Sequence, residues 1–275
     1  MRWPIWFICA GPSAFLRSFT LAQLHAATSL PLAGYPIVSI ASAALIPQLE
    51  QRLATPQKTI LLFANTNLVL KCQAMRSWLC GDEVILVNDG IGLDIAALLM
   101  HGQRYQENLN GTDFLPLLLK SLQVRHKIYL LGGMPGVAEK AAAVIQNDMD
   151  HEVVGCTDGF SKLDADSLRH QINQSAAEIV LVAMGNPIQE EWIRANADAV
   201  DARLLIGVGA LFDFLSGKAR RAPIWVQKIR FEWLFRLSLE PKRLLRRYTV
   251  DIASFMLLCL RDRKLTAEQT TLVNP

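Results

Sequence analysis

Cysteine and histidine are scarce in this sequence, and neither forms a pattern that binds a metal or cross-links the chain. The five cysteines are scattered over 275 residues without a C-x-x-C pair, and the five histidines are isolated. Disulfide frameworks and zinc sites both need their ligands at close, regular spacings. We therefore expect reduced cytoplasmic thiols, no metal ligands and no disulfide framework.

A long apolar run is also missing. The best candidate for a membrane span, residues 3–16, is too short and contains Pro4, Gly11 and Pro12. It is also a poor signal peptide, since Arg17 follows without a small-residue cleavage pattern. At 275 residues the chain is long enough to bury a full α/β core, and its 51% of hydrophobic residues against 19% charged residues is high for a freely soluble protein.

What the chain does contain is a repeated alternation of strand and helix patterns. Short, continuous apolar runs predict strands that are buried on both faces, at residues 59–63, 83–87, 128–131, 153–154, 179–183 and 203–208. Strands separated by helices predict a parallel sheet with right-handed crossovers. We therefore predict a Rossmann-like α/β core at 58–217, an apolar N-terminal extension at 1–57 and a basic helical appendage at 218–275.

Polar residues follow the first two predicted strands. Asn65 and Asn67 lie in the turn before a helix expected at residues 68–79, where such side chains cap a helix or bind a ligand. Asp89 comes directly after the second strand. Because open parallel sheets bind ligands at the carboxyl ends of their strands, Asp89 can project into a pocket. The alternative is that Asp89 caps the helix that follows.

Glycines accompany these strand ends. Gly90 and Gly92 follow Asp89, and glycine lets the backbone approach a ligand or adopt a positive φ. Gly132 and Gly133 follow the third strand, in a turn that can hold a phosphate on backbone N–H groups. That turn is neither a P-loop nor a G-x-G-x-x-G motif, and a tight strand-to-helix turn explains it equally well.

The fifth predicted strand leads into the clearest strand-turn-helix junction of the chain. Gly185 lies in the turn, Pro187 suits the first position of a helix, and Gln189 and Glu190 fall in the first helical turn. We interpret this junction as the lip of a ligand site. Asp213, after the last strand, is a second carboxylate at a strand end.

The C-terminal end is strongly basic. Residues 218–264 hold 13 of the 28 lysines and arginines against four acidic residues, with tryptophans interleaved. An amphipathic, basic, Trp-rich segment is typical of contact with a membrane interface. A helix packed on the domain with a solvated basic face is the alternative. A nucleic-acid surface is disfavoured because no recognised binding motif accompanies the charge.

Four blocks carry a resemblance when their order and spacing are taken together. They are Asn-Asp-Gly-Ile-Gly at 88–92, Met-Gly-Asn-Pro-Ile-Gln-Glu at 184–190, Gly-Val-Gly-Ala-Leu-Phe-Asp at 207–213, and the segment from Arg221-Ala222-Pro223 to Glu240-Pro241. In these blocks the chain resembles the WecG/TagA/CpsF family of bacterial glycosyltransferases. The resemblance covers residues 58–250 and leaves the N-terminal residues outside the family core.

The resemblance implies an inverting, metal-independent hexosyltransferase without a cofactor. Such an enzyme moves a sugar from a UDP-sugar donor to a saccharide on undecaprenyl or another polyprenyl diphosphate. The reaction takes place at the inner face of the cell membrane, in the synthesis of exopolysaccharide, teichoic acid or common antigen. The C-terminal appendage is then expected to complete the site and to make a peripheral membrane contact. The sugar and the oligomeric state stay open.

The family's roles are carried over at matching positions. Asp89 matches the general base, which takes the proton from the acceptor hydroxyl as that oxygen attacks the anomeric carbon. Gln189 matches the glutamine of a G-x-P-x-Q-E block and is expected to contact a sugar, with Glu190 as a supporting partner. Asn65 and Asn67 match only part of a polar turn that is often Thr-x-Asn in the family.

Other candidates rest on position. Where relatives often carry Arg-Val-x-Gly, this chain has Asn108-Leu109-Asn110-Gly111, and Asn110 is the candidate substrate contact there. Further candidate substrate contacts are Gly90, Gly92, Gly132, Gly133, Gly185 and Asp213. The candidate contacts to diphosphate or membrane are Arg220, Arg221, Arg236, Arg243, Arg246 and Arg247.

Two other classes of function compete with this hypothesis. A nucleotide-dependent oxidoreductase would use the same kind of sheet, but the first strand is not followed by G-x-G-x-x-G and a later acidic residue. A non-catalytic scaffold at the membrane surface would explain the basic end, but not the polar residues at the strand ends.

Overall fold

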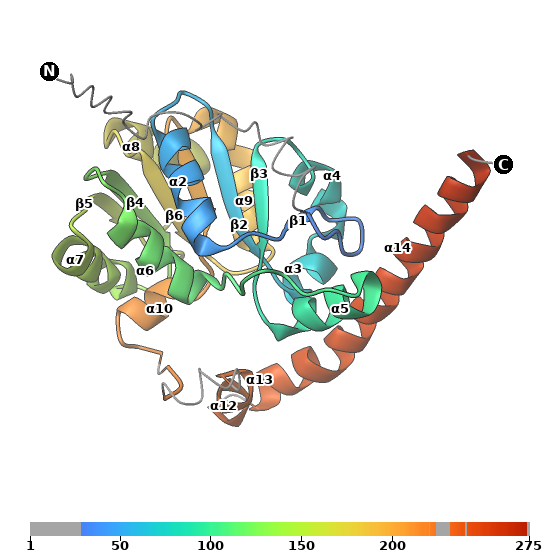
Figure 1. Ribbon diagram of the computed structural model, residues 1–275. Coiled ribbons are helices and arrows are strands. Elements are labelled where there is room, and N and C mark those ends of the chain that lie inside the picture. Colours follow the sequence, from blue (N-terminus) through green and yellow to red (C-terminus); the bar gives the residue numbers. More distant parts are fainter. Residues whose placement is uncertain (1–28, 220, 224–231, 240, 274–275) are drawn as a thin grey trace, which may run out of the picture.

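The computed structural model describes residues 29–219, 221–223, 232–239 and 241–273 (Figure 1). Seven parallel strands form one sheet in the order β1-β3-β2-β7-β6-β4-β5. The strands are β1 Ile37–Val38, β2 Thr59–Ala64, β3 Val84–Asn88, β4 Lys127–Gly132, β5 Glu152–Thr157, β6 Ile179–Ala183 and β7 Leu204–Gly207. The predicted Rossmann-like α/β fold with a helical C-terminal segment is confirmed.

Helices cover both faces of this sheet, which is why the strands are apolar throughout. Every residue of β2, β3, β6 and β7 is buried. Side chains of β2 alternate between two cores, with Leu61 and Phe63 in one and Ile60 and Leu62 in the other. The first core is closed by α2 Ser42–Leu53, α6 Gly111–Ser121, α7 Val137–Met149 and α10 Leu211–Leu215. The second is closed by α3 Thr66–Lys71, α4 Arg76–Leu79, α5 Ile91–His101, α8 Ala165–Gln174, α9 Ile188–Asn196 and α14 Ile252–Val273.

The N-terminal part of the chain differs from the expectation for residues 1–57. Residues 29–57 lie within the sheet domain, because β1 pairs with β3 and α2 packs on the first core. Leu45 and Leu49 of α2 are fully buried. Neither element could be predicted from the sequence pattern, because β1 has only two residues and α2 contains Pro47. Residues 1–28 lie outside the described part of the chain.

The helix expected at residues 68–79 is broken into three pieces. Helix α3 ends at Lys71, a 3₁₀ turn η1 covers Gln73–Met75, and α4 follows directly at Arg76. Cys72 lies at the break with φ −97° and ψ 19°, outside the α-helical range. Its thiol is fully buried toward Glu190 of α9. The break therefore places a polar contact that a straight helix would not make.

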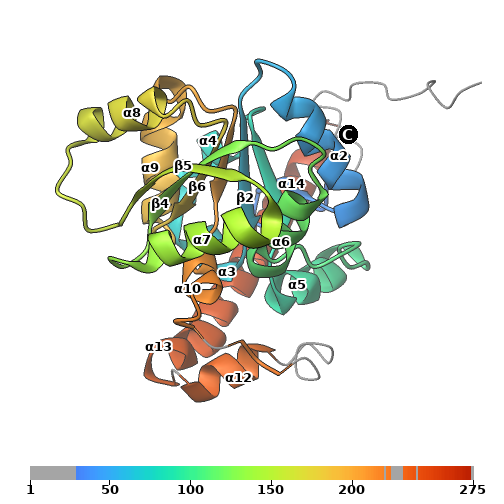
Figure 2. The ribbon, with the colours of Figure 1, turned by 90° about the vertical axis from the view of Figure 1, so that its left-hand side faces the viewer.

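The C-terminal segment consists of α12 Glu232–Leu239, α13 Pro241–Arg246, the π-helix η3 Arg247–Asp251 and α14. Both views place α12 and α13 beyond α10, on the side of the sheet where the strands end (Figures 1 and 2). Helix α14 then returns to the domain, where Phe255 and Cys259 are buried in the second core. Within the part that the structure describes, no helix is long and apolar enough to cross a membrane.

A buried histidine lies at the opposite, N-terminal end of the strands. His151 has its Nε2 atom 2.8 Å from the Leu119 carbonyl, and its Nδ1 atom accepts a hydrogen bond of 3.1 Å from the His126 N–H. An imidazole that accepts at Nδ1 and donates at Nε2 is neutral. Burial lowers the pKa of His151 below its usual value.

This arrangement predicts a loss of stability in mild acid. Below pH about 6.5 the unfolded chain takes up a proton at this residue before the folded chain does, so the free energy of unfolding falls by up to ~1.4 kcal/mol per pH unit until the folded pKa is reached. Urea unfolding at a series of pH values from 7.5 to 5 would measure the slope. His151→Phe should reduce the slope, whereas the same change at exposed His170 should not. An equal slope in wild type and His151→Phe would contradict the assignment.

Candidate active site

Polar groups that follow four neighbouring strands meet at the carboxyl edge of the sheet. The strands β3, β2, β7 and β6 are consecutive neighbours; the segments after β3, β2 and β6 supply side chains, and the segment after β7 supplies the backbone N–H of Gly209. The chain leaves β4 toward β5 but leaves β6 toward β7, in the opposite direction along the sheet. Ligands of open α/β sheets bind outside the strand ends, where successive connections diverge in this way.

Asp89 is held at this edge by its neighbours from β2. Its backbone N–H donates a 2.7 Å hydrogen bond to the Ala64 carbonyl, which extends the β2–β3 pairing by one residue. One carboxylate oxygen, Oδ2, accepts a 3.3 Å hydrogen bond from Nδ2 of Asn65. Asn65 is itself fixed, because its Oδ1 accepts from the N–H groups of Asn67 and Leu68 at the start of α3. Asn65 therefore both caps a helix and orients the carboxylate.

A second set of hydrogen bonds connects β2 to β6. Nδ2 of Asn67 donates to Oδ1 of Asn186 at 3.2 Å, and Nδ2 of Asn186 donates to Oε1 of Glu190 at 2.6 Å. Gln189 donates to the same Glu190 oxygen at 2.8 Å. Asn67 and Asn186 are half-buried, whereas Glu190 is completely buried. Within this series of hydrogen bonds, Asn67 and Asn186 are therefore the side chains that solvent can reach.

Gln189 connects two strand ends. Its Oε1 accepts the N–H groups of Gly185, after β6, and of Gly209, after β7, at 3.2 and 3.0 Å. With its Nε2 on Glu190 and only 3% of its surface exposed, this side chain is engaged within the protein. Gln189 therefore links the loop after β6 to the loop after β7 through hydrogen bonds, an arrangement here called the Gln189 bridge. We had expected Gln189 to contact a sugar directly.

The Glu190 carboxyl accepts hydrogen bonds from both Gln189 and Asn186. Burial raises its pKa above the usual value for glutamate, while the hydrogen bonds from Gln189 and Asn186 oppose that shift. Its second oxygen faces the Cys72 thiol at 3.9 Å. Burial, reinforced by the nearby Glu190, raises the pKa of Cys72 to about 12. The thiol therefore stays protonated and serves as a weak donor rather than a nucleophile.

Three of the predicted glycines are required by the backbone of this edge. Gly90 has φ +99° and donates its N–H to Oδ1 of Asn108 at 2.7 Å, and Gly185 has φ +74°. A Cβ on Gly92 would lie 2.9 Å from Cγ2 of Thr66, so α5 can begin close to α3 only with glycine there. Gly90 and Gly185 shape the loops after Asp89 and before α9, and Gly92 allows the close approach of α5 to α3.

The remaining predicted contacts lie elsewhere at the same edge. Gly132 sits against β6, where a Cβ would come within 2.3 Å of the Ala183 carbonyl oxygen, and the Gly133 N–H donates to that oxygen at 2.9 Å. Asn110 caps α6, with its Oδ1 accepting from the Asp113 N–H at 3.0 Å. Asp213 of α10 forms an ion pair with Lys218 at 3.1 Å. The structure does not link any of these to the Asp89–Asn65 pair by a hydrogen bond that it describes.

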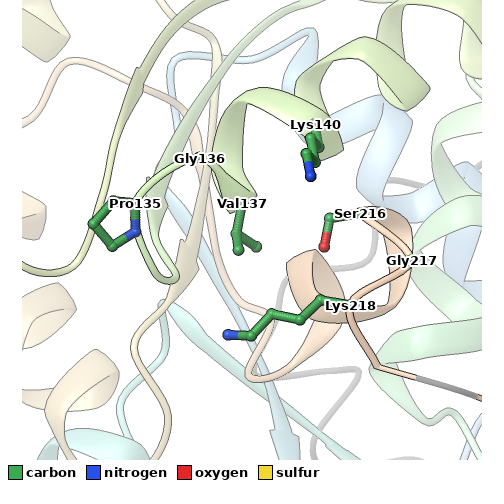
Figure 3. A pocket seen from close by; sticks show the side chains of 7 residues that line it. All are labelled: Pro135, Gly136, Val137, Lys140, Ser216, Gly217 and Lys218. Atoms are coloured by element: carbon green, nitrogen blue, oxygen red, sulfur yellow. The ribbon is translucent and has the colours of Figure 1, made fainter.

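A cavity of about 350 Å³ opens beside the Gly-rich turn after β4. It is lined by Pro135, Gly136, Val137, Lys140, Ser216, Gly217 and Lys218. Figure 3 shows Lys140 of α7 and Lys218 reaching it from different sides, with Ser216 between them. Its volume lies within the range of small-molecule sites, about 300–1,000 Å³. Lys140 and the first turn of α7 contribute positive charge to it, while the charge of Lys218 is shared with Asp213 in their ion pair.

The predicted arginines are only partly described. Nη2 of Arg221 lies 2.5 Å from Oδ1 of Asp113 and its guanidinium lies 6.0 Å from the Phe214 ring centre, so it ties the C-terminal segment to α6 and α10. Arg246, in α13, is exposed. Arg220 lies outside the described residues, as do the side chains of Arg236, Arg243 and Arg247.

Sequence reasoning missed several polar residues of this edge. Asn186 and Asn108 hold the two loops, and Lys140 and Lys218 line the cavity. Asn186 stood inside a block that was already singled out, so its amide next to Gly185 was the available signal. The two lysines had none, because they are 78 residues apart and resemble ordinary surface charges.

The fold and this edge define an α/β protein that binds its ligand at the ends of parallel strands, with one accessible carboxylate in a network of amides. A model of the Glycosyl transferase WecG/TagA/CpsF family matches residues 30–269, which is most of the chain. The chain belongs to this family and is a glycosyltransferase of cell-surface polysaccharide synthesis. The match begins at residue 30, so the family includes β1 and α2, which we had placed outside its core.

Proposed function

We propose that the protein is an inverting glycosyltransferase that moves a sugar from a UDP-sugar to a saccharide on a polyprenyl diphosphate, with Asp89 as the general base. One observation carries the assignment of the base. The network of asparagine and glutamine side chains at this edge holds two carboxylates, Asp89 and Glu190, and they differ in access, whereas the half-buried Asp213 lies outside this network in an ion pair with Lys218. Glu190 is completely buried among donors, whereas Asp89 is half-buried and can meet a substrate.

The chemistry follows from this position. An Asp89 oxygen takes the proton of the acceptor hydroxyl while that oxygen forms a bond to the anomeric carbon of the donor. The bond from the anomeric carbon to the UDP oxygen breaks on the opposite side, so the configuration inverts. Asn65 holds the carboxylate through its 3.3 Å hydrogen bond and keeps it aimed. General bases of this kind contribute about 10²–10⁴-fold to a rate.

The sugar contacts are assigned to the accessible amides of the network. Asn67 and Asn186 are half-buried, and each retains hydrogen-bonding capacity beyond the 3.2 Å bond between them. We place them against hydroxyl groups of the donor or acceptor sugar. Gln189 and Glu190 have a positioning role, because Glu190 accepts hydrogen bonds from both Asn186 and Gln189.

The leaving diphosphate needs positive charge as it departs. The cavity lined by Lys140 and Lys218 offers it on the same edge of the sheet, and exposed Arg246 offers it from α13. We place the nucleotide portion of the donor at that cavity. These cationic side chains and the N-terminus of α7 can stabilise the leaving diphosphate, so we propose that the transfer does not depend on a divalent metal.

A donor screen tests the proposal. The full chain is incubated with UDP-glucose, UDP-N-acetylmannosamine or a UDP-uronic acid, together with a sugar linked to a short-chain prenyl diphosphate. We expect transfer from one of these donors, release of UDP, and a product whose anomeric configuration by NMR is opposite to that of the donor. The same assay with EDTA should retain the rate. Retention of configuration, or activity restored only by a divalent metal, would overturn the corresponding part of the proposal.

Two alternatives have their own outcomes in this screen. Absorbance of a bound nicotinamide, with no transfer from any nucleotide sugar, would favour an oxidoreductase. Vesicle binding that is lost when residues 218–275 are removed, without binding of any nucleotide, would favour a scaffold. The family match argues against both, since its members are glycosyltransferases.

A further inference from the structure

Helix α5 presents an unusual surface directly after the loop that carries Asp89. Its inward residues Leu93 and Ala97 are fully buried in the second core. Its outward face is also apolar, and Ile91, Ile95, Leu98 and Leu99 are all exposed on it. These four are spaced at i, i+4, i+7 and i+8, so they form one stripe along the helix. A helix that is apolar on both faces is typical of one whose outer face meets something other than water.

A second apolar face lies on the neighbouring C-terminal helices. Helix α14 packs against α5 and α3, and its Phe255 and Cys259 are buried there. Its opposite side exposes Leu257 at 67% and Leu260 at 44%. Just before it, Leu245 of α13 and Val250 of η3 are exposed as well. Figure 1 shows α5 and α14 side by side at the same end of the molecule.

The charges around these faces have one sign. The exposed ionised side chains described at residues 89–107 and 241–263 are basic: Arg104, Lys242, Arg246, Arg261 and Arg263. In the same two stretches the carboxylates are half-buried or buried. Exposed apolar side chains rimmed by lysine and arginine match the composition of a bilayer surface, where acyl chains lie beneath anionic headgroups.

We propose that α5 and the outward side of η3 and α14 form one surface, here named the α5–α14 face, that docks on an anionic lipid bilayer. The proposal rests on the proposed function, because a lipid-linked acceptor is presented at a membrane. Its new element is α5. The stripe of Ile91, Ile95, Leu98 and Leu99 starts two residues after Asp89, so docking would bring the base to the level at which an acceptor sugar leaves the headgroups.

Vesicle sedimentation with the full chain tests the proposal. We expect binding to vesicles of phosphatidylglycerol and phosphatidylcholine, with weaker binding to phosphatidylcholine alone and at high salt. The double change Ile95→Ser and Leu99→Ser should reduce partitioning roughly tenfold, and so should Leu257→Ser with Leu260→Ser. All four side chains are exposed, so the folded state should be retained, as measured by circular dichroism.

The matched control is Val124→Ser, because Val124 is 61% exposed and precedes β4 at the opposite end of the strands. That variant should bind vesicles as the wild type does. Wild-type binding by the α5 double variant would remove α5 from the surface and overturn the proposal. A wild type that ignores vesicles but forms a dimer that the same substitutions dissociate would identify a second copy as the occupant instead.

The vesicle experiment is independent of catalysis. It contains no sugar donor, so its result stands even if no transfer is found in the donor screen. Transfer to a short, water-soluble acceptor should be unchanged in the α5 double variant, because neither Ile95 nor Leu99 belongs to the site. Transfer to a full-length prenyl acceptor in vesicles should fall with the partitioning. A fall in both assays would instead indicate a disturbed Asp89 loop.

Discussion

Asp89→Asn is expected to lower kcat by about 10²–10⁴-fold, the contribution of a general base. The change removes the basic oxygen but keeps the shape of the side chain. The amide oxygen that replaces Oδ2 can still accept the hydrogen bond from Asn65, so the loop and the donor KM should change little. The measurement is the rate of UDP release with a lipid-linked acceptor. Thermal unfolding of the variant should match the wild type.

The control is Asp82→Asn. Asp82 is an exposed carboxylate just before β3, at the opposite end of the strand from Asp89. It should transfer sugar at the wild-type rate, which would show that the effect belongs to the carboxyl edge and not to the loss of one negative charge. Undiminished kcat in Asp89→Asn would remove this residue as the base.

Gln189→Met is expected to destabilise the protein by about 1–3 kcal/mol, because a buried donor left without an acceptor costs about 1–3 kcal/mol and the two N–H groups concerned are part-buried. Methionine has a similar volume but no carbonyl oxygen, so the N–H groups of Gly185 and Gly209 both lose their acceptor. Glu190 loses one of its donors as well. Urea unfolding measures the change. The same substitution at exposed Gln73 should alter stability by less than about 0.5 kcal/mol.

Gln189→Glu separates the acceptor role from the donor role. The new carboxylate can still accept both glycine N–H groups, but it stands beside the buried Glu190 carboxyl, and two such groups cannot both be ionised. One of them keeps a proton in the folded state, so its folded pKa lies above the unfolded value. Such a group contributes stability at low pH that is lost as the pH rises through its folded pKa.

We therefore expect Gln189→Glu to lose stability, relative to the wild type, as the pH is raised from about 4.5 toward neutrality. The starting point is set by the unfolded pKa of glutamate, about 4.3. Unfolding curves at several pH values would record this trend. If the stability difference between Gln189→Glu and the wild type does not depend on pH, the two carboxyls are not in contact and the Gln189 bridge is refuted.

These expectations change the meaning of the stretch around Gln189. Its sequence pattern predicted a strand, a glycine turn and a helix with polar side chains, and all three are present. The pattern could not show that the side-chain oxygen of Gln189 accepts hydrogen bonds from the N–H groups of Gly185 and Gly209. Gly209 follows a different strand, and it comes within reach only because β7 lies beside β6. The accessible amides of this region are Asn186 and Asn67 instead.

Most of the sheet could be predicted, and the exceptions have local causes. Strands covered on both faces must be apolar throughout, so β2, β3, β6 and β7 are visible as continuous runs. Strand β1 was missed because two residues form no pattern. Helix α2 was missed because Pro47 lies inside it, although Leu45 and Leu49 are fully buried. The break at Cys72 was missed as well, and the contact that its thiol makes there is with Glu190, 118 residues away.

The sequence alone determined the kind of protein. Its apolar runs and turns define a parallel α/β sheet, and its four blocks identify the glycosyltransferase family. It also placed Asp89 at a strand end, since a residue that follows a buried parallel strand has to emerge at the carboxyl edge. These features are local, because burial on both faces, turn chemistry and motif spacing act over a few residues at a time.

Only the tertiary structure decided which of these residues work together. The order of the strands brings Asp89 to Asn65 and Asn67 to Asn186, and it buries Glu190 while leaving Asp89 accessible. The return of α14 onto α5 sets two apolar faces side by side. The physical reason is that side-chain hydrogen bonds and burial depend on which elements are neighbours in space, and that order arises from the packing of the whole chain.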